Sequence, residues 1–307
     1  MSGAVAAWRS FAQSDLWWRW KRTPSAIAAT VLLLVMVLAA FGADLIAPHN
    51  PFDPATLNVM DARFPPGWIE GGTWTYPLGT DDQGRDILSV ILYGMRISVL
   101  VGLAAVALSA VLGTCLGLVA GYAGGWADML IMRLGEVQLS FPTIMIAFFI
   151  DGVARILVPA EYREELRVLV VVLAIGFADW VQYARTVRAV TLVERNKDYV
   201  AAARLIGVGH LRILLGHILP NTMGSVLVIG TLGLAVAILT EAILSFLGLG
   251  MPPTQPSLGT LIRLGNDMLL SGEWWISLFP GAALVLLVLA VNMLGDWLRD
   301  ALNPRLR

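Results

Sequence analysis

Six apolar runs, each about the length of a membrane-spanning helix, limit what this chain can fold into. Crossing about 30 Å of hydrocarbon takes roughly 20 mainly apolar residues, and a helix satisfies its own backbone polar groups in lipid. The chain is 57% hydrophobic and only 14% charged, against about 25% charged in soluble domains. We therefore predict an all-α polytopic membrane protein with about six transmembrane helices, at residues 25–47, 97–121, 139–158, 168–187, 223–247 and 276–298.

The arginines and lysines predict the orientation of these spans. Fourteen of the 21 fall on one side if the N-terminus is cytoplasmic, and basic residues are concentrated in cytoplasmic segments. Both termini are therefore expected in the cytoplasm. Residues 1–24 would form a cytoplasmic tail and residues 25–307 a transmembrane domain, with an external segment at 48–96 and a cytoplasmic loop at 188–222. The first run is longer than a signal-peptide core of about 7 to 15 residues and is read as a retained span.

Two external segments are more than simple connections. In the first, Thr80 or Asp81 could cap a short helix before the second span, because their side chains accept hydrogen bonds from unpaired backbone donors. In the second, residues 245–275 are dense in glycine and proline, which force turns. A re-entrant excursion shielded by protein is one interpretation of this segment.

The cytoplasmic loop between spans four and five predicts two short helices separated at residues 207–209. Asp198 is the expected N-cap of the first helix and Gly207 its stop, while Pro220 would begin the next element. An apolar stripe with small residues at its centre runs along the first helix, formed by Tyr199, Ala202, Ala203 and Ile206. Such a stripe suits either a groove on a partner or the lipid surface, and its spacing does not decide between them.

Ionisable residues inside spans are costly in lipid and point to cavities or partners. Asp151 and Arg155 are four residues apart and can pair, whereas Asp179 and Glu241 have no obvious local partner. Asp151, Asp179 and Glu241 are therefore candidates for pathway or gating roles.

Small residues recur every four positions along span two, at Ser109, Gly113, Gly117 and Gly121. This ridge predicts close helix packing rather than a site. The single cysteine, Cys115, is read as a small core residue.

Several kinds of chemistry lack their sequence signals. The chain has no G-x-x-x-x-G-K-[ST] phosphate loop, so any ATP would be hydrolysed on another chain. Its three histidines are predicted outside the spans and far from the cysteine, which disfavours a metal or a catalytic site. A net charge of −1 offers no basic field for nucleic acid. An intramembrane enzyme is thus improbable, but an ion-coupled secondary transporter that uses the buried acids remains open.

Three stretches resemble the permease subunits of dipeptide and oligopeptide ABC importers, the family that includes nickel and glutathione importers. They are residues 79–98, residues 198–221, which resemble the EAA loop of importer permeases, and residues 240–259. Together the resemblance covers residues 18–304. It implies a type I ABC importer permease in the bacterial inner membrane.

The resemblance also implies partners. These are a second homologous permease subunit, two cytoplasmic ATPases that bind ATP and magnesium, an external substrate-binding protein, and membrane lipid. The first loop helix would enter a groove of an ATPase, and the residues implied in this coupling are Asp198, Tyr199, Ala201, Ala202, Ala203, Arg204, Ile206 and Gly207.

The sequence departs from the family pattern at two positions. Ala201 stands where the EAA pattern opens with an acid, and Leu258 stands where tryptophan is frequent. A salt bridge from position 201 to an ATPase is therefore not expected, and coupling would rest on shape and apolar contact.

Overall fold

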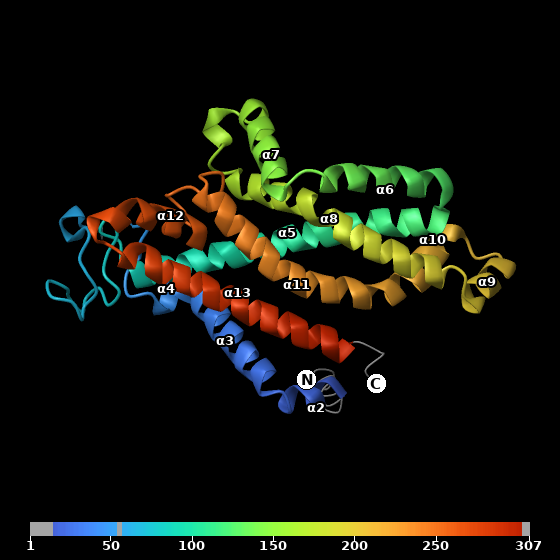
Figure 1. Cartoon of the computed structure of the whole chain (residues 1–307), viewed down its shortest axis with the longest axis horizontal. Helices are drawn as coiled ribbons and strands as arrows, with labels where there is room; N and C mark the ends of the chain where they lie inside the picture. The colour runs from blue at the N-terminus through green and yellow to red at the C-terminus, as the bar shows by residue number, and fades with distance from the viewer. Residues whose placement is uncertain (1–14, 54–56, 303–307) are drawn as a thin grey trace.

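The computed structural model describes residues 15–53 and 57–302, whose long helices run side by side along one axis (Figure 1). The helices, in chain order, are α2 (Asp15–Lys21), α3 (Pro24–Phe41), α4 (Ala43–Ile46), α5 (Ile87–Ala123), α6 (Gly125–Leu139), α7 (Thr143–Leu157), α8 (Arg167–Glu194), α9 (Asp198–Leu205), α10 (His210–Ile213), α11 (Leu219–Phe246), α12 (Leu258–Met268) and α13 (Trp275–Leu302). Short 3₁₀ turns η1 (Val59–Asp61), η2 (Ala160–Tyr162) and η4 (Leu269–Ser271) and the π-helical η3 (Leu214–Ile218) complete the described secondary structure.

Five helical stretches are long and apolar enough to cross a membrane, and a sixth span is possible if one bent pair counts as one span. The five are α3, α5, α8, residues 210–246 and α13. The predicted all-α polytopic fold is therefore confirmed.

The expectation of one continuous helix at 139–158 is wrong, because α6 and α7 meet at a 96° bend. Pro142 causes the break: it stands in extended backbone before α7, with ψ 140°, and a proline also steers the preceding residue away from helical geometry. The 15 residues of α7 span about 22 Å at about 1.5 Å per residue. That length is short of the hydrocarbon thickness.

The second predicted loop helix is not separate from span five. From His210 the chain continues through η3 into α11 without a gap, and Pro220 occupies the first turn of α11. Proline lacks the amide hydrogen and crowds the carbonyl four residues before it. The wider π turn at residues 214–218 lies at the carbonyl that Pro220 would crowd. The helix therefore continues beyond the proline instead of ending before it.

The small-residue ridge of α5 packs directly on α8, as predicted. A Cβ added at Gly117 would lie 2.6 Å from the Ala184 carbonyl oxygen, and one at Gly121 would lie 2.6 Å from Cβ of Thr191. Ser109 donates to the Gly176 carbonyl at 3.0 Å. Cys115 does not share this packing, because it is exposed on α5 and the prediction of a core residue is wrong.

The external loop before α5 is a compact hydrogen-bonded turn and not a capped helix. Asp81 accepts from the Arg85 Nε at 2.7 Å, with both side chains buried. The cap of α5 is Asp86, whose carboxylate accepts from the Ser89 amide at 2.9 Å. The expected caps at Thr80 and Asp81 are thus wrong, and α5 begins ten residues before the predicted span. Asp81 does not cap the helix because its carboxylate accepts hydrogen bonds from Arg85 within the turn.

The second external segment forms an irregular turn and then α12, which packs against α11 and α13. Ser257 caps α12 by accepting from the Thr260 amide at 3.3 Å. Side chains of α3, α5, α11, α12 and α13 share the largest buried apolar cluster, which includes Met36, Ile91, Ile238, Leu258 and Leu287. The segment is therefore part of the helical core.

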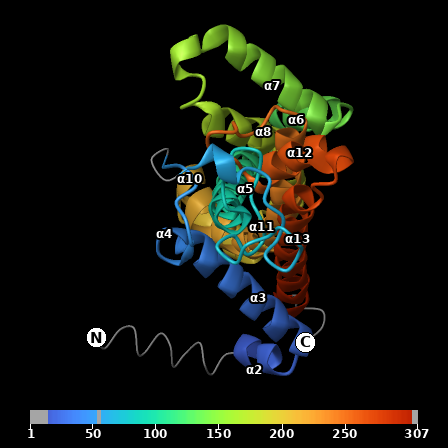
Figure 2. The ribbon, with the colours of Figure 1, turned by 90° about the vertical axis from the view of Figure 1, so that its left-hand side faces the viewer.

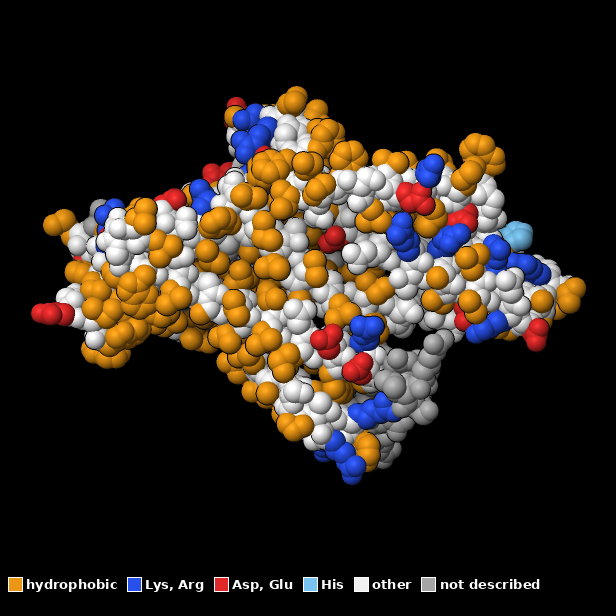
Figure 3. Space-filling model, viewed as in Figure 1, with side chains coloured by type: hydrophobic (Ala, Val, Ile, Leu, Met, Phe, Trp, Pro, Cys, Tyr) orange, Lys and Arg blue, Asp and Glu red, His pale blue; other side chains and the backbone are white. Residues whose placement is uncertain are grey.

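The molecule has two distinct ends (Figure 1). The loops before α5 and α12 lie at one end, and α9 lies at the other, toward which the start of α3 and the end of α13 also point. Seen along the long axis, α3 and α7 lie on opposite sides of the central helices (Figure 2). Hydrophobic side chains dominate the middle of the visible face, whereas arginines and lysines gather toward the α9 end (Figure 3).

The ridge packing predicts a large cost for a side chain at Gly117. Replacing Gly117 with valine should destabilise the chain by about 1–3 kcal/mol, the usual cost of overpacking, and should lower its thermal unfolding midpoint in detergent. Gly281→Val is the matched control, because nothing lies within 4 Å of a Cβ built at Gly281 on α13. Equal midpoints for the two variants would contradict the assignment of the ridge to close packing.

Candidate functional site

The helix α9 begins and ends through backbone geometry. Lys197, in extended backbone, is the N-cap, so Asp198 is the first helical residue and the predicted cap is off by one position. At the other end Gly207 has φ +80°. The Val208 amide donates to the Ala203 carbonyl and the Gly207 amide to the Arg204 carbonyl, both at 3.0 Å. This Schellman arrangement confirms Gly207 as the stop.

A polar cluster ties α9 to the ends of α8 and α11. Glu194 accepts from the Tyr199 hydroxyl and from the Lys197 ammonium, each at 2.6 Å. Asn221 donates to the Tyr199 hydroxyl at 3.2 Å. Burial and the hydrogen bond to the Glu194 carboxylate raise the pKa of Tyr199, which keeps its hydroxyl protonated as a donor. The loop helix is therefore anchored to two long helices.

The two faces of α9 differ sharply in exposure. Val200 and Ala203 are buried, in a cluster with Ile213 and Ile218. On the other side Ala201 and Ala202 are exposed, and Leu205 and Ile206 are 88% and 81% exposed. We call these four exposed residues, Ala201, Ala202, Leu205 and Ile206, the α9 outer face.

The predicted apolar stripe on α9 is therefore divided. Ala202 and Ile206 point outward, but Ala203 packs inside its own chain, so its expected role as a contact residue is corrected. Tyr199 is also turned toward the chain, through Glu194. Sequence reasoning missed Leu205, although its position four residues after Ala201 places both on one side of the helix.

Arginines near the end of α8 hold the base of α9 to neighbouring helices. Arg188 makes a two-pronged ion pair with Asp128 of α6. Arg195 donates to the Gly121 carbonyl at the end of α5 at 2.7 Å. Arg204, on α9 itself, lies over the Tyr122 ring, 5.4 Å from its centroid. These three arginines thus have structural partners.

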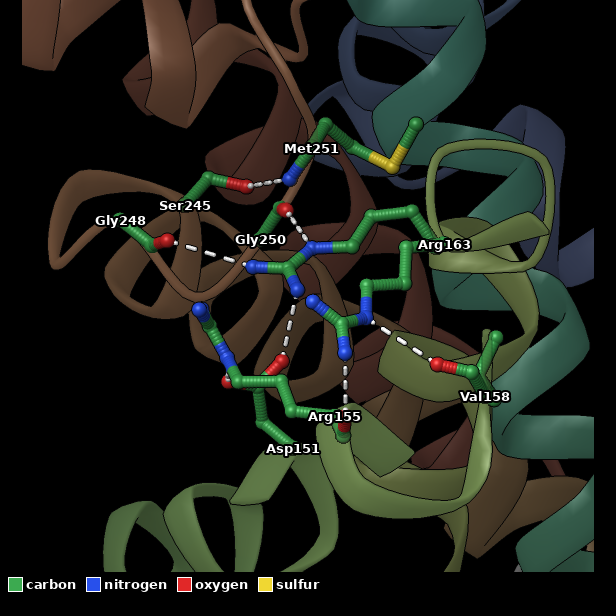
Figure 4. Close-up of polar contacts among 9 residues, drawn as sticks. Asp151, Arg155, Val158, Arg163, Ser245, Gly248, Gly250 and Met251 are labelled. Carbon is green, nitrogen blue, oxygen red and sulfur yellow. Dashed lines mark hydrogen bonds and ion pairs between the residues drawn. The ribbon is translucent and has the colours of Figure 1, made fainter. Parts of the chain in front are cut away.

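Asp151 of α7 is the centre of an ion-pair cluster (Figure 4). Its side chain is only 6% exposed and pairs with Arg155, as predicted, and with Arg167 of α8, both at 2.7 Å. Arg167 also donates to the carbonyls of Gly250 and Gly248, at 2.7 Å and 3.2 Å. The cluster joins α7 and α8 to the turn after α11 and borders a cavity of about 410 Å³.

Glu241 is fully buried and held by serines. Ser98 of α5 donates to one carboxylate oxygen at 2.9 Å, and Ser245 donates to the other at 2.6 Å. Ser257, the cap of α12, donates to Ser245 at 3.0 Å, and the Leu258 amide donates to Ser98 at 3.3 Å. The expectation that Glu241 lacks a local partner is wrong, since Ser245 lies one helical turn away. The carboxylate links α5, α11 and α12.

Asp179 differs from the other two acids. It is half-buried in a pocket of about 180 Å³ between α5, α8 and α11. Within residues 15–53 and 57–302 it makes no hydrogen bond or ion pair, and the same pocket is lined by Ser109, Gln182 and Tyr183. Of the three predicted pathway residues, only Asp179 borders a pocket without a partner of its own.

The comparisons with known proteins agree with this architecture. Residues 113–307 match the family described as binding-protein-dependent transport system inner membrane component. The chain belongs to this family. Residues 7–66 match a second model, the N-terminal transmembrane domain of oligopeptide transport permease C.

Curated relatives cover almost the whole chain. The dipeptide transport system permease protein DppC of Haemophilus influenzae is 39% identical over 95% of both chains. The Pseudomonas aeruginosa di/tripeptide transport system permease protein DppC is 37% identical, over 95% of this chain and 92% of the relative. DppC of Escherichia coli K12 is 40% identical, over 95% and 93%.

Family membership settles the class of function. The chain is a multi-pass inner-membrane component of a binding-protein-dependent ABC transport system. The ion-coupled secondary transporter, the alternative left open by the buried acids, is therefore replaced by the importer assignment.

The serine network predicts different outcomes for two substitutions of Glu241. Glu241→Ala leaves buried serine donors unpaired, which costs about 1–3 kcal/mol, and should lower the thermal unfolding midpoint. Glu241→Gln keeps an acceptor and should retain most of the stability. Glu136→Ala, at a half-exposed position, controls for loss of a surface carboxylate. A Glu241→Ala midpoint equal to that of Glu136→Ala would refute the network's role.

Proposed function

We propose that this chain and a second homologous permease subunit form the pathway by which an ATP-driven importer takes up di- or oligopeptides. The proposal rests first on the three relatives, whose names specify dipeptide or di/tripeptide transport and which align over nearly their full lengths. An external binding protein would deliver the peptide. ATP and magnesium would bind to two separate ATPase subunits, because this chain has no phosphate loop.

The observation that carries the coupling proposal is the α9 outer face. It exposes two large aliphatic side chains, Leu205 and Ile206, beside two alanines at the end of the molecule (Figure 1). Burying aliphatic surface is favourable by about 25 cal/mol per Å², and a helix with an apolar face commonly binds in a groove. The alanines leave room for close approach. We assign this face to the groove of an ATPase subunit.

The neutral residue at position 201 fits this kind of contact. Ala201 is exposed beside Leu205 on the outer face, where an acid would lose its hydration on burial and would need a cationic partner to offset that cost. Asp198 and Arg204 flank the face and would form its polar rim. Binding would thus depend on apolar area rather than on one salt bridge.

Anchoring of α9 provides a route for the mechanical step. Closure of the ATPases around ATP would displace α9, and the Glu194–Tyr199–Asn221 cluster would pass that displacement to α8 and α11. Rigid-body movement of helices around a central site is the usual form of alternating access. In this proposal the α9 end, toward which both described termini lie, is cytoplasmic, and the loops before α5 and α12 receive the binding protein.

Charge on the α9 outer face should separate the permease from its ATPases. Leu205→Glu and Ile206→Glu should each weaken ATPase association at least thirtyfold, about 2 kcal/mol, and abolish peptide-stimulated ATP hydrolysis. The measurement is ATPase recovery with the purified complex, together with hydrolysis in proteoliposomes that contain the binding protein.

Leu270→Glu is the matched control, because Leu270 is also a fully exposed leucine but lies in η4, toward the other end of the molecule. It should retain the ATPases. If the Leu205 and Ile206 variants kept the ATPases as well, α9 would not be the coupling surface. If the unaltered chain recovered no ATPase, the importer assembly itself would be refuted.

A further inference from the structure

The pocket around Asp179 lies near the middle of the helical bundle. Asp179 is 12 residues after the start of α8 and 15 before its end, about 18 Å and 22 Å along the helix at 1.5 Å per residue. The pocket walls come from three helices: Val106 and Ser109 of α5, Gln182 and Tyr183 of α8, and Ile229, Leu232, Gly233, Val236 and Ala237 of α11. The pocket is therefore a mid-membrane feature. It lies between α8 and α11, to which α9 is anchored, and α5, which packs against them.

The Asp179 carboxylate and the Tyr183 hydroxyl, both in this pocket, have no hydrogen-bond partner among the described residues. The Tyr183 side chain is buried, with the whole residue only 3% exposed. Its hydroxyl oxygen has no hydrogen bond within the described part of the chain. It lies against Gly233, where an added Cβ would stand 2.7 Å from it. Asp179, one helical turn earlier, is on the same side of α8. A buried hydroxyl without a partner costs about 1–3 kcal/mol, and an unpaired carboxylate costs more.

These unsatisfied groups match the chemistry of one ligand group. A protonated amine carries three donors and a positive charge, so it can pair with the Asp179 carboxylate while donating to the Tyr183 oxygen and the Gln182 carbonyl. Among the described residues no basic side chain lines this pocket, so the carboxylate is open to a cation from outside the chain. By contrast, Asp151 and Glu241 already have arginine and serine partners.

We propose that the Asp179–Gln182–Tyr183 pocket binds the protonated amino group of the peptide as it crosses the membrane. This inference rests on the proposed peptide import. The volume of about 180 Å³ equals about six water molecules at about 30 Å³ each, enough for an amino group and the first residue. The rest of the peptide lies outside the pocket. Asp179 supplies the charge, Tyr183 and Gln182 fix the direction of the amine, and Gly233 leaves space for the tyrosine hydroxyl.

The test reports pocket occupancy through one thiol. Cys115 is the only cysteine of the chain, so Cys115→Ser with Val236→Cys places the sole thiol of this subunit on an exposed side chain that lines the pocket. The assembled importer is reconstituted in nanodiscs and treated with N-ethylmaleimide, an uncharged reagent. Labelling of position 236 is followed by mass spectrometry with 10 mM dialanine, N-acetyl-dialanine or sodium chloride.

We expect dialanine to slow labelling at least threefold and N-acetyl-dialanine, which lacks the charged amine, to leave the rate within 1.2-fold. Adding Asp179→Asn should remove the protection, whereas Asp179→Glu should keep at least half of it, and Tyr183→Phe should weaken it about twofold. Equal protection by the two dipeptides, no protection, or unchanged protection with Asp179→Asn would overturn the proposal. Equal protection by sodium chloride would identify a metal-cation site and would also overturn it.

Binding-protein-stimulated ATP hydrolysis is measured on the same nanodiscs. If stimulation is present but dialanine does not protect through Asp179, the pocket inference fails and the proposed import function stands. If the Cys115→Ser parent shows no stimulation with peptide-loaded binding protein, the proposed function fails and the inference fails with it.

Discussion

The close approach of α5 and α8 is the contact on which the rest of the structure depends. Without side chains at Gly113, Gly117 and Gly121, the backbones meet along about two helical turns, and in lipid such packing takes over the role that the hydrophobic effect has in water. At one end of the ridge, the Ser109 hydroxyl donates to the Gly176 carbonyl, and Ser109 lines the same pocket as Asp179. At the other end, Gly121 packs against Thr191. Its carbonyl accepts a hydrogen bond from Arg195, which lies between the end of α8 and the start of α9.

Sequence reasoning found the spans because their length follows from the thickness of the hydrocarbon, which does not depend on tertiary contacts. It failed where the backbone departs from a straight helix. Pro142 and Pro220 were both visible in the sequence, yet one turns the chain by 96° and the other is passed through a π turn. Hydrophobic periodicity reports that a segment is helical but not how successive segments are directed. Likewise, it could not tell that Ala203 packs inward and Leu205 outward, because both faces of α9 carry apolar residues.

The three buried acids show where local sequence helps and where it stops. Arg155 lies four residues after Asp151, and Ser245 four after Glu241, so each acid has a partner one turn away. Their second partners, Arg167 and Ser98, come from other helices and could not be inferred from spacing. For Asp179 the residues one turn away are Ile175 and Tyr183, and the structure adds no basic residue from α5 or α11. The cost of a charge in lipid therefore flagged three acids of two kinds. Asp151 and Glu241 connect helices through their own partners, whereas the Asp179 carboxylate is open to the pocket.

The geometry also relates the pocket to the coupling helix. Tyr199 of α9 touches α8 through Glu194 and α11 through Asn221, and the same two helices carry Asp179 and Gly233, which both line the pocket. Asp179 is 15 residues from Glu194, and Gly233 is 12 residues from Asn221, about 22 Å and 18 Å along rigid helices. Because the glycine ridge packs α5 closely on α8, we expect those two helices to move together, so that a change in pocket width would come from α11. A displacement of α9 that shifts α11 against α8 would therefore alter the distance between the carboxylate and the opposite wall, which is the change needed to bind an amine in one state and release it in the other.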